Sequence, residues 1–240
     1  EICDETSIIQ NRNGLLFLPN QTQPYSGVNL CTFENGQYKA HGEYTNGLKD
    51  GIWTSWSKNG IKKIELNYIL GSLQSRTWFS SLHYKKMALI NYINGVESTG
   101  IMWGYFDNGI LKKKANLKDN KLNGKFIQWY PNGNKEYQGD YIDDVQQGIW
   151  RHWHENGKIE EEVRFIDDKR DGTSKQWKEN GIKWEDVNYK NGKLHGVWTK
   201  WHENGQKRRD RYYDEGNKVG METSWYPNGE IAEVGNYKLD

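Results

Sequence analysis

Hydrophobic residues recur at a fixed spacing along most of the chain, and this spacing predicts a repeat protein. The motif G-I-W-T-x-W-x-E-N-G returns every 24 residues, with its first glycine at positions 27, 51, 100, 124, 148, 172, 196 and 220. The interval between Gly51 and Gly100 holds one further unit, in which Ser75 stands in place of the first glycine. A fixed period of this length is the signature of a repeat architecture. We therefore expect about nine units over residues 27–240.

Each unit is predicted to be one β-hairpin when its residues are numbered from the first glycine. Positions 1–7 form one strand, E-N-G turns the chain, and positions 11–18 return. Position 6 is mostly Trp and position 18 is mostly Tyr. Position 21 is Gly, Asn or Asp in all eight units that we aligned, and these residues tolerate a left-handed backbone. A second turn is therefore expected there.

The E-N-G turn has two alternatives, which differ in register. A two-residue N-G loop would be type I′, whereas a three-residue x-N-G loop would be a type I turn followed by a glycine bulge. Pro131 and Pro227 at the x position favour the second, because proline suits the first central residue of a type I turn. That register places positions 2, 4, 6, 12, 14, 16 and 18 on one apolar face. This face would collect Ile52, Ile149, Val197, Val163, Val187 and the Trp and Tyr rows.

A second aromatic row at position 3 would then lie on the opposite, mostly polar face. Its members are Trp53, Met102, Phe126, Trp150 and Trp198. Ser174 and Glu222 interrupt the row. Either these side chains shield the sheet by cross-strand packing, or they form a binding strip, because exposed aromatic residues tend to mark recognition surfaces. They are the candidate partner-binding residues.

Composition supports this architecture and excludes others. The chain has 12 Trp, 15 Tyr and 26 Gly but is only 35% hydrophobic. Helical bundles need more Ala and Leu, and disordered chains lack aromatic residues. The net charge of +1 does not indicate nucleic-acid binding. No apolar run approaches the ~18–20 residues of a transmembrane helix, and contact with a membrane surface is not indicated.

No set of residues indicates catalysis or a metal. His152 and His154 share one face of a strand, but two histidines without further ligands make a weak site. The acidic residues at 160–162 alternate with basic ones in the manner of a cross-strand charge ladder. The glycines are turn residues rather than a phosphate-binding loop. We therefore expect no enzyme activity, no cofactor and no metal.

Two segments depart from the repeat. Residues 1–26 are predicted to form an N-terminal arm or cap, which a disulfide between Cys3 and Cys31 would tie down in an exported protein; the alternative is two unpaired thiols. If Glu1 is a processed N-terminus, the protein is periplasmic, cell-surface or extracellular; otherwise it is cytoplasmic. The irregular unit at 75–99 has Tyr84 where the bulge glycine belongs, so its turn must change shape, through degeneration or as a specialised partner site.

The recurring Y-x-N-G-K-L-x-G-x-W-T-x-W-x-E-N-G, clearest at residues 189–205 and 44–60, resembles the MORN-repeat-variant family. The resemblance covers about residues 24–240. Bacterial members are often YwqK-type antitoxins, which bind and neutralise a toxin. The family implies a non-catalytic interaction scaffold and transfers no catalytic residues.

Together these features predict an all-β fold, an elongated single antiparallel sheet of hairpin repeats. The expected function is non-enzymatic protein interaction, with an antitoxin or immunity role as its most concrete form. The alternative is an exported, self-assembling surface or filament subunit joined through open sheet edges. A minor alternative is choline, carbohydrate or lipid binding through the aromatic rows.

Overall fold

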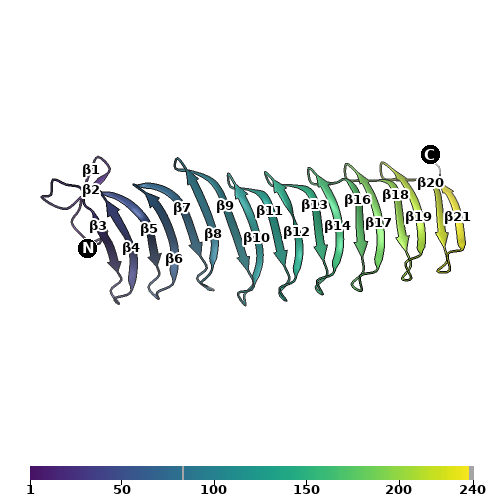
Figure 1. Cartoon of the computed structure of the whole chain (residues 1–240), viewed down its shortest axis with the longest axis horizontal. Helices are drawn as coiled ribbons and strands as arrows, with labels where there is room; N and C mark the ends of the chain where they lie inside the picture. The colour runs from purple at the N-terminus through teal and green to yellow at the C-terminus, as the bar shows by residue number, and fades with distance from the viewer. Residues whose placement is uncertain (83, 238–240) are drawn as a thin grey trace. The chain divides into compact units, whose positions relative to one another are not determined.

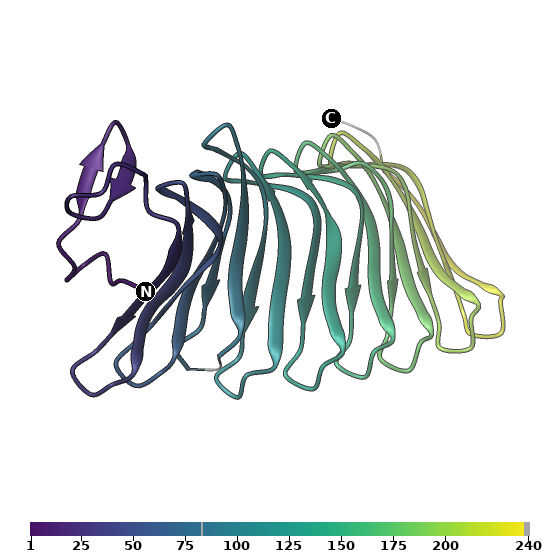
Figure 2. The ribbon, with the colours of Figure 1, turned by 60° about the vertical axis from the view of Figure 1, so that its left-hand side comes forward.

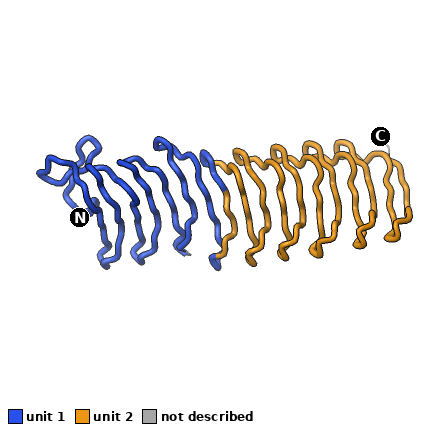
Figure 3. The backbone as a smooth tube through the Cα atoms, in the orientation of Figure 1, with its two compact units in different colours: residues 1–109, 116–120 blue, residues 110–115, 121–240 orange. Residues whose placement is uncertain are grey.

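The computed structural model describes residues 1–82 and 84–237. These residues form β-strands and turns without any helix, so the predicted all-β class and antiparallel hairpin repeats are confirmed. In the described part of the chain there is accordingly no helix long and apolar enough to cross a membrane. The chain divides into two compact units, residues 1–109 with 116–120 and residues 110–115 with 121–240 (Figure 3).

In each unit, neighbouring strands follow one another in chain order (Figure 1). The strands of the first unit are β1 (Gln10–Arg12), β2 (Leu15–Phe17), β3 (Gly27–Thr32), β4 (Tyr38–Thr45), β5 (Leu48–Trp56), β6 (Lys62–Ile69), β7 (Ser72–Phe79), β8 (Lys86–Ile93) and β9 (Val96–Tyr105). Strand β10 (Leu111–Lys118) contributes residues to both units. The strands of the second unit are β11 (Lys121–Trp129), β12 (Lys135–Ile142), β13 (Val145–Trp153), β14 (Ile159–Ile166), β15 (Lys169–Arg170), β16 (Gly172–Trp177), β17 (Lys183–Lys190), β18 (Lys193–Trp201), β19 (Lys207–Asp214), β20 (Asn217–Trp225) and β21 (Ile231–Tyr237).

The E-N-G segments form the predicted type I turn with a glycine bulge. In the hairpin of β13 and β14, the amide of Gly157 donates to the carbonyl of His154, and the amide of His154 donates to the carbonyl of Lys158, both at 2.9 Å. Gly157 has a φ of 82°, which is the left-handed conformation that the bulge requires. The three-residue loop chosen from the two proline positions is therefore confirmed.

The turns at the other end of the hairpins are two-residue type I′ turns. Ile142 pairs with Val145, and the two residues between them, Asp143 and Asp144, have φ values of 51° and 70°. The left-handed conformation expected at position 21 is confirmed in all eight units. Position 20 is left-handed as well, even where it holds Leu70 (44°) or Glu215 (47°), residues for which this conformation is costly.

The predicted assignment of residues to the two faces is wrong, because a second bulge recurs in the hairpins of both units. His152 pairs with Glu161, but the next residue, Trp153, pairs with Ile159, so that Glu160 is an extra residue in the returning strand. The same shift recurs in six other hairpins. A shift of one residue moves every side chain beyond it to the opposite face. Positions 1, 3 and 5 therefore share a face with positions 14, 16 and 18, here called the inner face, and positions 2, 4 and 6 lie on the outer face.

Burial follows this corrected register. The position-2 residues Ile52 and Ile149, expected in the core, are 50% and 44% exposed, and Val197 is only partly buried on the same outer face. Trp53 and Trp150 at position 3, expected on the polar face, are each only 6% exposed. The Trp row at position 6 and the Tyr row at position 18 consequently lie on opposite faces, whereas the expected burial of Val163, Val187 and Tyr44 is confirmed.

The irregular unit changes its turn as expected. Tyr84 has a φ of 55°, so a bulky residue does occupy the left-handed position. Its amide donates to the carbonyl of Ser80, four residues earlier, at 3.0 Å, whereas the regular turns close over three residues. One more residue is therefore accommodated in the loop, and His83 within it lies outside the described residues.

Asparagine side chains connect four of the turns to the next one along the chain. The side-chain amide of Asn156 donates to the carbonyl of Glu179 at 2.8 Å, and Asn204 makes the equivalent bond to Pro227 at 2.6 Å. The Oδ1 of Asn156 also accepts from the amide of Lys158 at 3.0 Å. The asparagine of the motif thus stabilises its own turn and the contact with its neighbour.

Candidate functional site

Aromatic rings on the inner face of the second unit pack in a connected row. The indole of Trp150 makes edge contacts with Tyr141 (5.1 Å between ring centroids) and Phe165 (6.3 Å), and Phe126 lies 6.0 Å away in a tilted contact. Tyr141, Phe165 and Phe126 are only partly buried. The second unit consists of the strands of its sheet and their connecting turns, so no further layer of its own described residues covers these rings.

The residue at position 16 sets how the following position-3 tryptophan lies. A Cβ placed on Gly139 would lie 2.2 Å from ring atoms of Trp150, so the indole rests directly on this glycine. Gly42 and Trp53 repeat this arrangement in the first unit. Where Val187 takes the glycine's place, the Nε1 of Trp198 donates instead to Glu185 Oε2 at 2.8 Å.

The five residues predicted to bind a partner do not form one exposed strip. Trp53 and Trp150 are buried, whereas Met102, Phe126 and Trp198 are partly exposed. Phe126 and Trp150 are in contact with each other. Their place on the inner face follows from the second bulge. The role of the row in partner binding stays a prediction, but its exposed part consists of the rings around the buried tryptophans.

In the first unit, the N-terminal segment packs on the same face. Leu16, Tyr44 and Trp53 form a buried cluster, and Ile2, Ile9 and Tyr25 of this segment pack against it. The amide of Leu16 donates to the carbonyl of Gly47 at 3.0 Å, and the amide of Gly47 donates to the carbonyl of Tyr25 at 2.7 Å. Figure 2 shows this segment, in purple, beside the first hairpins.

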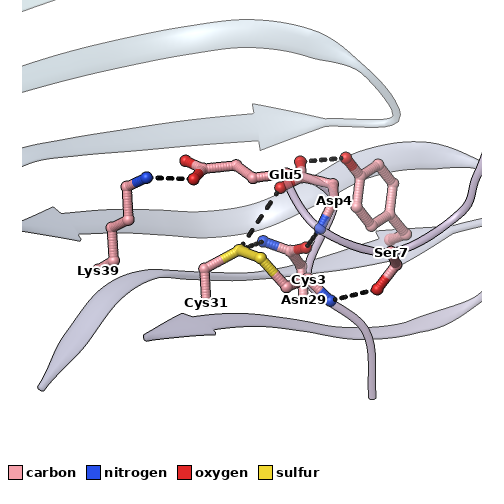
Figure 4. Close-up of a disulfide and its surroundings, with 8 residues drawn as sticks. Cys3, Asp4, Glu5, Ser7, Asn29, Cys31 and Lys39 are labelled. Atoms are coloured by element: carbon pink, nitrogen blue, oxygen red, sulfur yellow. Dashed lines mark hydrogen bonds and ion pairs between the residues drawn. A yellow bond between two sulfur atoms is a disulfide. The ribbon is translucent and has the colours of Figure 1, made fainter. Parts of the chain in front are cut away.

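A disulfide joins Cys3 to Cys31 of β3 and holds the N-terminal segment to the sheet (Figure 4). Beside it, Ile2 forms a parallel bridge with Asn29, and the carboxylate of Asp4 accepts a 2.9 Å hydrogen bond from the hydroxyl of Tyr44. Burial, followed by this hydrogen bond to Asp4, raises the pKa of Tyr44. Main-chain bonds, a carboxylate and apolar side chains therefore all attach this segment to the sheet.

Charged side chains alternate with the rings on the inner face. Arg170 donates two hydrogen bonds to Glu161, at 2.8 and 3.1 Å, and Ser174 also donates to that carboxylate at 2.7 Å. Glu185 pairs with Lys200 at 3.1 Å. Each of these acids has its own cation, so this part of the face is electrically balanced.

The last two hairpins differ, because three cations meet one carboxylate. Arg209 Nε and Arg211 Nε lie 3.2 and 3.0 Å from Glu222 Oε1, and Lys218 pairs with Oε2. Burial alone would raise the pKa of Glu222, but hydrogen bonds from Lys218 and Arg211 lower it. This cluster was not predicted from the sequence, although Glu222 interrupts the aromatic row and Arg211 stands where the other units have Gly, Ala, Val, Leu or Ile.

The histidines of the motif make structural hydrogen bonds. His154 and His202, both at position 7, place Nε2 2.9 and 2.8 Å from the position-6 carbonyl of the next hairpin. His152 stacks on Tyr137 at 4.1 Å, and its Nδ1 lies 3.1 Å from Glu160. These contacts explain the histidines without a metal ion.

Two groups among the described residues bring three metal-ligating side chains close together. One is Cys3, Asp4 and Cys31, whose sulfur atoms are bonded to each other. The other is His195, Asp214 and Glu215 at an exposed turn, where Glu215 already pairs with Lys193 at 3.3 Å. Neither group has the features of a catalytic centre.

The MORN repeat variant family matches six segments, which together cover more than half of the chain: residues 49–69, 122–143, 146–167, 170–191, 194–217 and 218–239. No curated protein matches the chain.

Similar solved structures include the TcdB2–TccC3 complex without the hypervariable C-terminal region (11% identity, TM-score 0.15). The Photorhabdus luminescens Tc holotoxin pore (12%, 0.17) and TcdB2–TccC3-TEV (13%, 0.14) are also similar. These matches cover 92–93% of this chain but only 16% of the other chain in each case.

Proposed function

The chain belongs to the MORN repeat variant family, and from this premise we propose that it is a non-enzymatic scaffold that binds a protein partner on its inner face. MORN repeats mediate protein or membrane interactions and are typically non-catalytic. Beyond this general role, the proposal specifies that the partner is a protein and that it binds to the inner face.

The observation that carries the proposal is the partly exposed aromatic face of the second unit. Phe126, Tyr141, Phe165, Trp198 and Tyr213 present rings that their own unit leaves partly open. Rings with polar neighbours are typical of the centre of protein interfaces, where they bury much area at low entropic cost. In the first unit the equivalent face is covered by the N-terminal segment, which indicates that the face can hold an added chain segment.

The finer form of this proposal is an antitoxin or immunity protein acting in an oxidising compartment. Neutralising a toxin requires a large complementary surface, which the repeated hairpins supply. The disulfide between Cys3 and Cys31 supports an exported location, because such bonds persist mainly outside the cytosol.

The experiment is capture of purified candidate partners, beginning with the products of neighbouring genes, by the full chain and two variants. Trp198→Ala removes an inner-face ring, and Ile149→Ser changes an outer-face side chain that is 44% exposed. We expect Trp198→Ala to weaken capture and Ile149→Ser to leave it unchanged, with thermal unfolding confirming that both fold. Equal capture by both variants would place the interface elsewhere, and no partner among the candidates would count against an immunity role.

Self-assembly is the second candidate, favoured by exposed apolar side chains in the last hairpin. Met221, Ile231 and Val234 are 55%, 62% and 53% exposed. Apolar side chains gathered at one place on a surface promote association. Light scattering over a range of concentrations tests this, and a monomer at the highest concentration would exclude it. Val234→Asp should abolish any assembly that uses this hairpin.

Choline binding is not favoured, because protein cations already lie over the ring faces that such a ligand needs. Lys200 lies 4.9 Å from the ring centroid of Trp198, and Lys218 lies 3.4 Å from that of Tyr237. A quaternary ammonium ligand would have to displace them.

A further inference from the structure

The cations of the last two hairpins outnumber the acids that face them. Arg209, Arg211 and Lys218 share the single carboxylate of Glu222, whose side chain is 14% exposed. The two arginines and the lysine are themselves 35%, 24% and 25% exposed. This cluster therefore carries a net charge of about +2 that solvent can reach, since Arg and Lys stay protonated at neutral pH.

The other acids nearby do not balance this excess. Glu185, on the same face, is taken by Lys200 at 3.1 Å. Asp210 belongs to position 15 on the outer face, where it pairs with Lys207 at 2.8 Å. Glu233 is exposed and lies on β21, on the far side of Ser224 from Arg209.

The guanidinium groups of Arg209 and Arg211 both approach Glu222 through their Nε atoms. The Nε of Arg211 donates to Glu222 Oε1, and the Nε of Arg209 faces the same oxygen without an aligned hydrogen bond. Arg211 also lies 5.6 Å from the ring centroid of Trp198 and within hydrogen-bond reach of the Tyr213 side chain. Since Nε is the atom that each arginine turns to Glu222, the Nη groups face no second carboxylate among the described residues, and a planar carboxylate matches their geometry.

In the first unit, carboxylates of an added chain segment already bind to the sheet. Its N-terminal segment places the carboxylate of Asp4 on the Tyr44 hydroxyl and that of Glu5 on Lys39. Tyr213 repeats Tyr44 at position 18, and the exposed Arg208 repeats Lys39 at position 13. The last hairpins therefore carry the same two kinds of contact group, together with three further cations.

We propose that the inner face of β19–β21 binds an acidic, extended peptide segment of a partner protein, with Arg209, Arg211 and Lys218 receiving its carboxylates. The proposal rests on the proposed function and adds the chemistry of the partner. Glu222 occupies the place of a ligand carboxylate, holding the cations together and competing with the incoming anion. Tyr213 and Trp198 border the cluster and supply apolar contact for the residues between the acids.

The test uses the full chain and a fluorescein-labelled peptide with the sequence of residues 1–9, in which Cys3 is replaced by serine. This peptide carries three acids, Glu1, Asp4 and Glu5, among isoleucines. A matched peptide with lysine in place of the acids is the charge control. Fluorescence anisotropy gives the dissociation constant, and the acidic peptide should bind at least about tenfold tighter, which corresponds to about 1.4 kcal/mol.

Variants of the protein show where the peptide binds and whether the carboxylate of Glu222 competes with it. Arg209→Gln with Arg211→Gln should weaken binding about tenfold, because two charges are lost. Lys183→Gln with Lys207→Gln removes the same charge from the outer face and should change binding less than about twofold. Glu222→Gln should strengthen binding, because it removes the competing carboxylate. A merely structural role for the cluster predicts no gain from Glu222→Gln.

Several results would overturn the proposal: equal losses in the two double variants, weaker binding by Glu222→Gln, or equal binding of the lysine peptide. Binding to phosphatidylglycerol vesicles or inorganic phosphate, without binding to the acidic peptide, would assign the cluster to a lipid or a free anion instead. If Arg209→Gln with Arg211→Gln does not fold, the peptide affinities of Glu222→Gln and Lys218→Gln are measured instead. The proposal then requires stronger binding by Glu222→Gln and weaker binding by Lys218→Gln. Capture of a partner through Trp198 together with failure of the peptide would reject this inference alone and leave the proposed function standing.

Discussion

Replacement of Gly139 by alanine is expected to destabilise the second unit, because the indole of Trp150 rests directly on this glycine. The added Cβ would lie 2.2 Å from two ring atoms, whereas ordinary contacts begin at 3.4 Å. The ring or the strand must therefore move by more than about 1 Å. Trp150 is 6% exposed and in contact with Tyr141, Phe165 and Phe126, so it has little room to do so.

The loss in the free energy of unfolding caused by Gly139→Ala follows from two opposed effects. Forcing extra volume into a packed site costs about 1–3 kcal/mol, and the severity of this clash favours the upper end. Replacing a glycine that is not in the left-handed region by alanine returns about 0.4–1 kcal/mol, because it restricts the unfolded chain. The net loss in the free energy of unfolding should be about 2 kcal/mol. Urea denaturation measured by circular dichroism gives this value, and amide hydrogen exchange should show the loss in β12 and β13.

Gly235→Ala is the matched control, because Gly235 holds the same position in the last hairpin and neither glycine has a left-handed φ. Its nearest neighbour would be a ring atom of Tyr237 at 3.5 Å, so this variant should be neutral or slightly stabilised. In a Trp150→Ala background, Gly139→Ala should lose most of its effect. Equal stabilities of Gly139→Ala and Gly235→Ala would refute the packing of Trp150 on Gly139.

Four further outcomes are expected. Reduction of the Cys3–Cys31 disulfide should lower the stability of the first unit by about 2–4 kcal/mol and speed amide exchange in residues 1–26, as measured by mass spectrometry. Leu70→Gly should raise the free energy of unfolding by about 1 kcal/mol in urea denaturation, because φ is 44° there; unchanged stability would contradict this. Asn156→Ala should cost about 1–2 kcal/mol by the same measurement, because it removes hydrogen bonds to its own turn and to the next hairpin. The lowered pKa of Glu222 stabilises the folded protein fully at pH values above 4.5, the pKa of this group in the unfolded chain. This stabilisation is lost as the pH falls through the lower pKa of the folded state. In a pH titration of the unfolding temperature, Glu222→Gln should therefore show a smaller drop below pH 4.5 than the unmodified protein.

The repeat and its turns could be predicted from the sequence because each depends on a few adjacent residues. The E-N-G glycine and the Gly, Asn or Asp at position 21 are demanded by the backbone angle at one residue. Proline at 131 and 227 favoured one of the two turn types for a local reason, because proline suits the first central residue of a type I turn. These expectations therefore held along the chain, and even the distorted turn at Tyr84 followed from a single substitution.

The faces of the sheet were decided only by the tertiary structure. The extra residue at position 13 is Lys63, Glu160, Trp184 or Arg208 in different units, so no residue type marks the second bulge. Its presence depends on how the whole strand packs: the bulge brings the position-3 tryptophans and the position-18 tyrosines to one face, where they bury each other. The cation cluster around Glu222 has the same origin, because its members become neighbours only when positions 3, 14 and 16 share that face. The sequence alone thus determined the hairpins, their period and their turns, whereas the cooperative packing of distant residues determined which side chains a partner can reach.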